Sequence, residues 1–521
     1  MILRRFCVRW IPTRVITCLM MFTACWTTYM CRLQMPILAV PMIKTMAGNA
    51  SRGACVEQHR VRRAISLLDP GAYLEDYILQ EKLEAAQDDV DYYSSSIRLP
   101  RETRPSDEPI QLATGLPFDW TPQIRGQLIA AYSYGNVPGN LMGGILALRW
   151  GPKKAILWTS LVAALVCLFT PIFAQIHWGL LIFMRIVVGV AGGITFPACH
   201  TLVAKWAPPD EKARFVWSLL GGTFGTILTY PMVAVIAEKI NWENGWYIPS
   251  LLMLLWVLFF AVFTYDSPSE HPGISDEEKQ YILSSQAGTV ATKKPSLART
   301  PVKAILTSVP FISLVCCHFG NLFLIFFFQN AMMLYLAKAL GFELTKGGLA
   351  ASLPWAGRMF FGFIFSWGGD TLKHKRIVSI TVLRKCATVF SHLIPGIFLI
   401  LVGYAGCSLL LANTFLVLAL GFNGAASIAN LSNNQDLSPN YAGFLYGIMN
   451  TIGCTSGMII SPLVEEIAGK HGNSIERWQI LFWIGAAVCI LCMLVFLLGG
   501  SGEIQPWNDV RDTDREEEGR N

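Results

Sequence analysis

Two arginines lie deep inside long apolar segments that contain no aspartate or glutamate. Arg32 lies within residues 11–43 and Arg185 within residues 180–204. A guanidinium keeps its charge in any protein environment, so it needs an anionic or strongly polar partner. In a membrane, such a residue usually faces a bundle interior or a watery cavity. Because neither segment supplies a carboxylate, we expect the missing anion to be the ligand, and the two arginines predict an anion transporter.

Each arginine also has an interpretation without a ligand. Arg32 lies near the outer end of its segment, so its side chain could reach the membrane interface or bond to a helix C-terminus. Arg185 could donate to backbone carbonyls or to a distant acid. Arg358 lies in another apolar segment without acids and is either a third cavity cation or an interfacial anchor.

Two histidines are the candidates for coupling transport to protons, because histidine alone titrates near neutral pH when unperturbed. His200 lies 15 residues after Arg185, which returns it to within about 60° of the same helix face. His318 opens the seventh predicted span. The alternative for each is a buried neutral histidine that is hydrogen-bonded to a neighbour.

Tyr29, Tyr134 and Asn450 are polar groups in apolar segments and are expected to line a cavity, although aromatic packing explains the tyrosines equally well. The chain shows no nucleophile–base motif, metal-ligand spacing or phosphate-binding loop. We therefore predict no enzyme activity, no cofactor and no metal. Of the 14 cysteines only Cys55 lies in the longest loop, so no disulfide scaffold is expected.

The elements that must position these residues are membrane helices. The chain has 521 residues, of which 53% are hydrophobic and only 15% are charged, whereas soluble domains carry roughly 25% charged residues. Apolar segments long enough to cross a bilayer recur along it. We expect helices near 13–43, 125–147, 153–173, 178–204, 213–238, 247–265, 304–337, 346–368, 377–402, 406–430, 441–467 and 477–499.

A polar, Pro- and Ser-rich stretch divides these helices into two sets of six. The predicted organisation is an N-terminal half at 1–265, a central cytoplasmic linker at 266–303, a C-terminal half at 304–500 and a cytoplasmic tail at 501–521. Two six-helix halves are typical of transporters with a binding site near the midplane. The long loop at 47–122 follows the first helix.

The net charge of +6 follows the predicted topology. Lys and Arg gather before the first span and in alternate short loops, for example at Lys153, Lys205 and Lys373, which places both termini in the cytoplasm. The charge therefore needs no nucleic-acid partner; membrane lipid is the expected surrounding. The loop at 47–122 then faces the outside or a lumen, where Asn49 in Asn-Ala-Ser is a glycosylation acceptor.

Several strings, taken in order, resemble the anion:cation symporter family of the major facilitator superfamily, which includes sialin, the vesicular glutamate and nucleotide transporters and the type I phosphate/urate transporters. The strings are TFPACH at 195–200, KWAPP from 205, HPGISDEEK from 271, QDLSPNYAG at 435–443, NTIG at 450–453 and GSGEIQPW at 500–507. The resemblance implies an all-α membrane fold with about 12 transmembrane helices in two six-helix halves.

The resemblance also assigns roles to single residues. Arg32 matches the first-helix arginine that is thought to meet the substrate's anionic group, and Gln34 stands where the family has an asparagine. Arg185 matches a fourth-helix arginine. Gly192, seven residues later, stands where the family carries a proton-linked glutamate, which puts the usual proton coupling in doubt. Asn321 stands where the glutamate branch has a further arginine, so a vesicular glutamate transporter is not the first choice.

The superfamily's loop signature is present in altered form. GILALRWGPK at 144–153 keeps the glycine and Arg149, but Leu148 replaces the usual acid; the second half offers Asp370. We expect Arg149 and Asp370 to hold helix ends together by charge pairing and helix dipoles, without touching substrate. An ordinary surface loop is the alternative.

The favoured hypothesis is a secondary active transporter of small organic anions, carboxylates or phosphates, that works by alternating access. The coupling ion is H⁺, with Na⁺ or movement driven by membrane potential as alternatives. A lysosomal, vesicular or plasma membrane is expected. The competing hypothesis is a non-transporting receptor or scaffold that retains the transporter fold, which the missing acids at 148 and 192 would suit.

Overall fold

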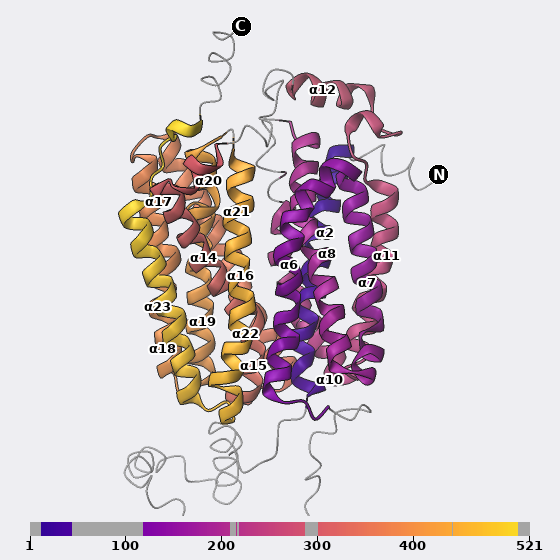
Figure 1. The fold of residues 1–521 in the computed structure, drawn as a ribbon, viewed down its shortest axis with the longest axis vertical. Helices are drawn as coiled ribbons and strands as arrows, with labels where there is room; N and C mark the ends of the chain where they lie inside the picture. Colours follow the sequence, from indigo (N-terminus) through magenta and orange to yellow (C-terminus); the bar gives the residue numbers. More distant parts are fainter. Residues whose placement is uncertain are drawn as a thin grey trace, which may run out of the picture.

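The structure is a computed structural model that describes residues 12–43, 118–208, 215, 218–286, 301–439 and 441–508. Two bundles of long helices stand side by side (Figure 1). The first, the N-terminal half, contains α2 (Thr13–Met42), α6 (Pro122–Trp150), α7 (Pro152–Ile176), α8 (Trp178–Trp206), α10 (Gly221–Lys239) and α11 (Asn244–Phe263).

The second bundle, the C-terminal half, contains several helices that change geometry along their length. Its helices are α14 (Val309–Asn330), α16 (Leu344–His374), α17 (Ile380–Thr388), α18 (Ile394–Tyr404), α19 (Leu409–Asn423), α20 (Asn430–Leu437), α21 (Ala442–Cys454), α22 (Ser456–Ile467) and α23 (Ile475–Gly499). The short elements α15 (Met332–Leu334) and η6 (Tyr335–Ala339) follow α14, the π-helical turn η7 (Val389–Leu393) joins α17 to α18, and the 3-10 turn η8 (Gly424–Ser427) precedes α20.

Ten helical segments in the described residues have the length and apolarity to cross a membrane. α2 and α6, which are 30 and 29 residues long, are additional to these ten, and with them the bundle contains two sets of six (Figure 1). The predicted fold class is confirmed. α2 is one continuous helix despite Pro36 and Pro41, whereas the turns η7 and η8 inside the later spans were not predicted.

The helix α12 (Asp276–Gln286) lies across one end of the N-terminal half (Figure 1). Its Glu278 carboxylate accepts hydrogen bonds from the backbone N–H groups of Thr13 and Arg14, both at 3.0 Å. These N–H groups open α2 and have no partner within the helix. α2 therefore begins at this side of the molecule, which we call the α12 end; the other side is called the opposite end.

Glycines allow the closest helix contacts. A Cβ at Gly135 would lie 1.9 Å from the Ile186 carbonyl oxygen, and a Cβ at Gly189 would lie 2.0 Å from the Tyr132 carbonyl oxygen. α6 and α8 therefore pack backbone to backbone, as small residues permit in membrane bundles. The two halves meet mainly where α6 contacts α22 and α10 contacts α16, nearer the opposite end than the α12 end in the view of Figure 1.

Candidate functional site

Arg185 is fully buried and holds the backbone of α2. Its Nη1 donates to the Cys31 carbonyl at 2.9 Å and its Nη2 to the Arg32 carbonyl at 3.2 Å. Pro36 explains why the Arg32 carbonyl is available, because proline has no N–H to donate four residues back along the helix. Arg185 thus donates to backbone carbonyls, which is the alternative to substrate binding. Its contact with a substrate stays a prediction.

Arg32 has a different environment. Its side chain is 7% exposed, and its guanidinium carbon lies 4.1 Å from the ring centre of Phe326, 5.1 Å from that of Tyr132 and 6.0 Å from that of Tyr29. Its Nε is buried without an acceptor among the described residues. Aromatic faces stabilise a cation by about 0.5–2 kcal/mol each and accept no conventional hydrogen bond. Because Phe326 belongs to α14, the guanidinium lies between the two halves.

Arg358 approaches the same region from the C-terminal half. Its Nε donates to the Asn423 side-chain oxygen at 3.0 Å, and Asn423 in turn donates to Asn321 at 3.0 Å. Tyr29 interacts electrostatically with both Arg32 and Arg358. The two cations, one from each half, therefore both lie in the neighbourhood of Tyr29. This arrangement favours the cavity interpretation of Arg358 over an interfacial anchor.

Tyr132, which the sequence interpretation overlooked, lies beside Arg32, whereas the predicted Tyr134 does not contact it. Tyr134 donates to Gln127 at 2.7 Å at a partly exposed position. A Cβ at Gly192 would lie 2.0 Å from the Tyr132 hydroxyl oxygen. Tyr132 thus fills the space that a side chain at 192 would need. No sequence signal relates the two positions until the register of α6 against α8 is known.

Gln34 is fully buried and faces α11. Its Nε2 donates to the carbonyls of Gly245 at 3.3 Å and Trp246 at 3.5 Å. The amide therefore links α2 to the first turn of α11, and its role in binding substrate remains a prediction.

His318, Asn450 and three further asparagines form a chain of hydrogen bonds that crosses between the halves. Asn430 donates to Nδ1 of His318 at 2.7 Å, and Nε2 of His318 lies 3.5 Å from the Asn450 side-chain oxygen. Asn450 donates to Asn140 of α6 at 3.2 Å, and Asn140 donates to Asn136 at 3.0 Å. The predicted residues His318 and Asn450 are thus direct neighbours.

His200 and His318 both lie near the ring of Tyr446. The ring centres of His200 and Tyr446 are 5.7 Å apart, and those of His318 and Tyr446 are 6.1 Å apart. The side chain of His200 has exposed surface area, whereas His318 is 1% exposed. The two candidate histidines, one from each half, therefore lie beside the same tyrosine ring.

A buried ion pair also joins the halves, and the sequence interpretation missed it. Arg125 of α6 donates from Nε and Nη2 to the two carboxylate oxygens of Glu465 of α22, each at 2.6 Å, and the side chains are 4% and 2% exposed. A Cβ at Gly469 would lie against a Glu465 carboxylate oxygen, and one at Gly126 would lie 2.9 Å from its Cγ. The partners are 340 residues apart, so nothing local predicts the pair.

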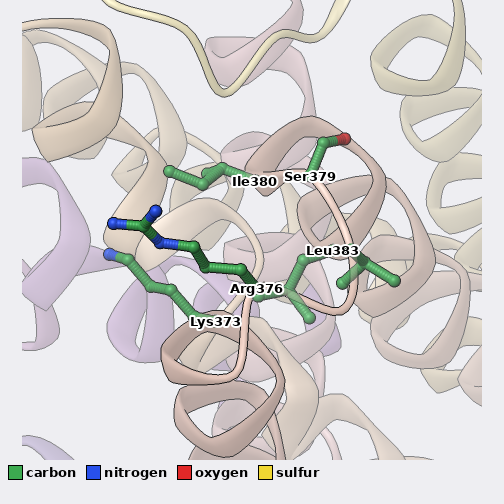
Figure 2. Close-up of a pocket in the computed structure, with 6 residues that line it drawn as sticks. Lys373, Arg376, Ser379, Ile380 and Leu383 are labelled. Carbon is green, nitrogen blue, oxygen red and sulfur yellow. The ribbon is translucent and has the colours of Figure 1, made fainter.

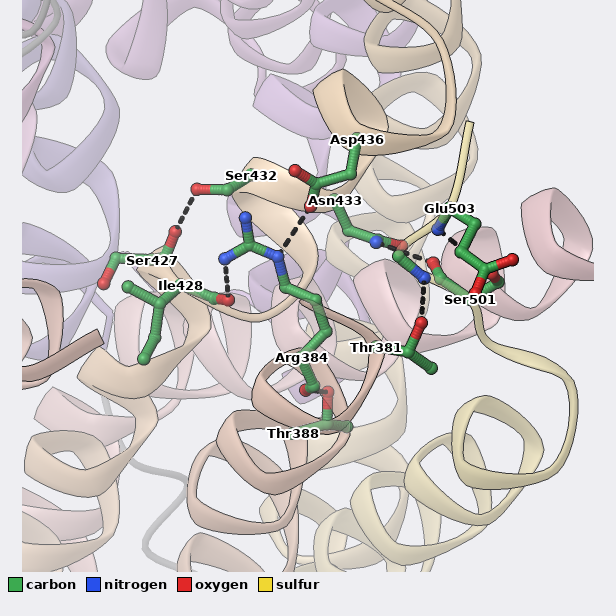
Figure 3. A network of polar contacts seen from close by, with 11 residues as sticks. Thr381, Arg384, Thr388, Ser427, Ile428, Ser432, Asn433, Asp436, Ser501 and Glu503 are labelled. Atoms are coloured by element: carbon green, nitrogen blue, oxygen red, sulfur yellow. Dashed lines mark hydrogen bonds and ion pairs between the residues drawn. The ribbon is translucent and has the colours of Figure 1, made fainter. Parts of the chain in front are cut away.

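The α12 end contains a polar network within the C-terminal half (Figure 3). Arg384 donates to Asp436 at 2.7 Å and to the Ile428 carbonyl at 2.6 Å. Asn433 donates to the Ser501 carbonyl at 2.8 Å. The Gln505 N–H also donates to the Leu437 carbonyl at 2.9 Å, so the strings at 435–443 and 500–507, which carry the family resemblance, meet in the fold.

The predicted structural residues of the loops are at the surface. Arg149 and Asp370 are both exposed, and neither forms an ion pair within the described ranges. Beside the α16–α17 turn lies an open groove of about 290 Å³ lined by Lys373, Arg376 and residues 378–380 and 383 (Figure 2). None of Arg32, Arg185, Arg358, His200 and His318 lines this groove.

Three further sequence features concern a disulfide, metal binding and glycosylation. Cys407, before α19, is disulfide-bonded, so the expectation of a chain without a disulfide is wrong. In the described residues no cluster of His, Cys, Asp or Glu could hold a metal ion. Asn49, the predicted glycosylation acceptor, lies outside the described residues.

Comparison with protein families and curated proteins places the chain among transporters. Residues 109–462 match the model of the Major Facilitator Superfamily. Vesicular glutamate transporter 2 of Homo sapiens is 30% identical over 405 residues, which cover 77% of this chain and 68% of that protein. Human sialin is 30% identical over 395 residues, which cover 76% of this chain and 79% of sialin.

Solved structures share the fold at low identity. A bacterial homologue of the human lysosomal transporter Spinster, inward-facing and unoccupied, has a TM-score of 0.61 at 12% identity, covering 95% of this chain and 99% of that one. The xylose transporter XylE from E. coli, inward-open and partially occluded, has a TM-score of 0.58 at 13% identity, covering 93% and 96%.

Proposed function

Because this chain belongs to the major facilitator superfamily, within its group of sialin-like anion:cation symporters, we propose that it moves small organic anions across a membrane by alternating access. The observation that carries the proposal is the guanidinium of Arg32, buried between the halves among aromatic rings with its Nε unbonded. A carboxylate there would supply the strong, charge-assisted hydrogen bonds that the rings cannot.

The other buried arginines indicate which anion fits. Arg185 already uses two donors on the α2 backbone, and Arg358 uses Nε on Asn423. Arg32 is therefore the principal anchor, and Arg358 is available from the opposite half for a second polar or anionic group. We favour a carboxylate over a phosphate, because the rings of Tyr29, Tyr132 and Phe326 suit a substrate with an apolar body.

The direction of access follows from the orientation. Basic residues at helix ends, such as Lys153 of α7 and Lys373 of α16, lie on the α12 side, which the positive-inside rule assigns to the cytoplasm. The disulfide-bonded Cys407, between α18 and α19, is consistent with an oxidising lumen or exterior at the opposite end. The buried pair of Arg125 and Glu465 then seals the lumenal or extracellular side.

The driving force is membrane potential, a proton gradient or both. A net negative substrate feels about 2.3 kcal/mol per charge per 100 mV, enough for useful accumulation without a coupled ion. Tyr132 fills the space beside Gly192, so a proton would need another site, for which His200 and His318 are the candidates. Na⁺ remains the alternative coupling ion.

The test is uptake into proteoliposomes of purified protein, with sialate, glutamate, urate, nucleotides and phosphate offered in competition. Arg32→Lys keeps the charge but removes the planar fork, so we expect KM for a transported carboxylate to rise about tenfold or more, with Arg32→Ala abolishing uptake. Arg477→Ala, an exposed arginine of α23, is the matched control and should transport normally.

The competing scaffold hypothesis gives a different result in the same assay. Absence of accumulation of every tested anion by the folded wild-type protein, under both an imposed potential and an imposed pH gradient, would exclude transport and favour a receptor or scaffold. Unchanged KM in Arg32→Lys would exclude Arg32 as the anchor while leaving transport intact.

A further inference from the structure

The hydrogen bonds around His318 all run in one direction. Asn430 donates to Nδ1 of His318 at 2.7 Å, so the ring proton of a neutral His318 is on Nε2, which faces the Asn450 oxygen at 3.5 Å. The Asn450 amide nitrogen then points to the Asn140 oxygen at 3.2 Å. Asn140 donates to both the side-chain and backbone oxygens of Asn136.

Asn430 is poised between two orientations. Its side-chain oxygen is buried and has no donor in the part of the chain that the structure describes, although Asn430 is fully buried. A protonated His318 would carry N–H donors on both ring nitrogens. Its Nδ1–H would then face the Asn430 NH₂, which is another donor. Rotating the amide by half a turn replaces this repulsion with an N–H···O bond to the free oxygen.

The broken helix explains why this amide is inside the bundle. α19 ends at Asn423, the turn η8 spans Gly424–Ser427, and α20 starts at Asn430 with Ala429 at φ −90° and ψ −100°. A continuous helix would give Asn430 a different direction. The break thus places an adjustable amide against the histidine.

We propose that His318 and Asn430 form the proton-binding site of the transport cycle, in which protonation of Nδ1 is accompanied by rotation of the Asn430 amide and is communicated to the N-terminal half through Asn450 and Asn140. The proposal rests on the proposed transport function. A positive charge on the ring strengthens the bond from Nε2–H to Asn450, and Asn450 of α21 in turn donates to Asn140 of α6.

The surroundings allow this charge to come and go. The titratable groups that face His318 are Tyr446 of α21 and His392 of η7, and His200 of α8 also lies near the ring of Tyr446. From α23 the thiols of Cys489 and Cys492 interact with the neighbouring Cys317. Asp436, the acid of α20, is bonded to Arg384. None of these groups is a carboxylate that would hold His318 permanently charged.

His392 has a similar burial but a different connection. Its Nε2 lies 2.9 Å from the Cys317 carbonyl and its Nδ1 lies 2.7 Å from the Ser391 hydroxyl. Both partners belong to the C-terminal half. Among the described residues, the hydrogen bonds of the His392 ring therefore stay within the C-terminal half, whereas His318 is two bonds from α6.

The experiment separates the two driving forces in proteoliposomes of the full-length protein. Uptake of a transported carboxylate is measured under a pH gradient without potential and under a potential without pH gradient. We expect the gradient-driven uptake rate of His318→Gln to fall at least about tenfold, which is the factor by which one pH unit changes the proton concentration. Potential-driven uptake by the same variant should stay within about twofold of the wild-type rate. His374→Gln, at the exposed end of α16, should retain both.

A second variant keeps the test informative if His318→Gln does not fold. Asn430→Asp places a negative charge beside Nδ1–H of His318. Such a neighbour stabilises the protonated, positively charged imidazole, and the shift is about one to three pH units. The pH of half-maximal uptake should therefore move upward. An unshifted profile in folded Asn430→Asp would overturn the proposal.

The remaining outcomes are also decisive. Gradient-driven uptake that survives in His318→Gln, or that is lost in His200→Gln instead, would overturn the proposal while leaving the transport function standing. Wild-type protein that accumulates no anion under either force would refute the proposed function itself, which keeps the two failures distinguishable.

Discussion

Two of the polar contacts between the halves have opposite character. Near the opposite end, Arg125 and Glu465 form a two-pronged ion pair at 2.6 Å that is almost fully buried. Deeper along α6, the amides of Asn140 and Asn450 make a neutral bond at 3.2 Å. Both contacts connect α6 to the continuous run of α21 and α22, so one pair of helices carries a charged contact and a neutral one.

The difference indicates how each contact can break. Removing one partner of a buried ion pair leaves an uncompensated charge and costs about 3–5 kcal/mol, whereas a neutral hydrogen bond contributes about 0.5–1.5 kcal/mol. The ion pair is therefore stable only while both charges are present and the halves stay closed there. The amide bond is weak enough to form and break in every cycle. We infer a firm seal at one end and an adjustable contact within the bundle.

The largest expected effect comes from breaking the ion pair. Glu465→Gln leaves Arg125 buried without its counter-charge, so the sealed arrangement should lose about 3–5 kcal/mol. A cysteine introduced at Ala468, which is fully buried beside the pair, should then react with a membrane-impermeant maleimide at least about tenfold faster than in the parent. The labelled peptide is quantified by mass spectrometry against the native cysteines.

The charge-swapped double variant controls for this result. Arg125→Glu with Glu465→Arg restores opposite charges, although Gly126 and Gly469 shape the slot for a glutamate. Labelling at position 468 should therefore return part of the way to the parent rate. Equal labelling in the single and double variants would show that packing, and not charge, seals this end.

The same contrast shows what could be predicted from the sequence. The apolar segments and the linker predict the helices and the halves, because burial in lipid imposes a length and a composition on every span. Arg32, His318 and Asn450 could be singled out because a polar residue in an apolar segment is conspicuous by itself. The predicted spans place these three residues in the same central region of the bundle only approximately.

Contacts that depend on helix register could not be predicted. Arg125 lies at a helix end, where a cation is ordinary, and Glu465 is conspicuous only when Arg125 is known to face it. Tyr132 and Tyr134 are two residues apart on the same helix, and only the packing of α6 against α8 places Tyr132 over Gly192. The Arg32 carbonyl that accepts from Arg185 is free because Pro36 has no N–H to donate to it. Pro36 is visible in the sequence, but only the fold shows that Arg185 uses the free carbonyl.

A moderate effect is expected from the neutral contact. Asn140→Ala removes the acceptor of Asn450 but leaves no charge unpaired, so the cost should be about 1 kcal/mol. Uptake should slow by about fivefold, while labelling of the cysteine at position 468 stays at the parent rate. Faster labelling in Asn140→Ala would mean that the two contacts open as one unit. It would contradict the distinction between a firm seal and an adjustable contact.

The smallest effect concerns Lys338 of η6, half-buried near the ion pair. Burial, and secondly the charge of Arg125, lowers the pKa of Lys338 to about 8. Between that value and the ordinary lysine pKa of about 10.4, the folded protein binds fewer protons than the unfolded chain. The contribution of Lys338 to the free energy of unfolding should therefore rise as pH increases from about 8 to about 10.4. Lowering the pH across the same window reverses this change. Because the side chain is partly solvated, we expect only about 1 kcal/mol.

Lys338→Met should remove that dependence. The measurement is the melting temperature at pH 8 and pH 10, taken as the difference between wild type and variant so that other titrating groups cancel. In the Glu465→Gln background the unneutralised Arg125 repels Lys338 more strongly, so the pH dependence should grow. An unchanged difference there would show that Lys338 responds to burial alone and that the charged contact does not extend beyond its two partners.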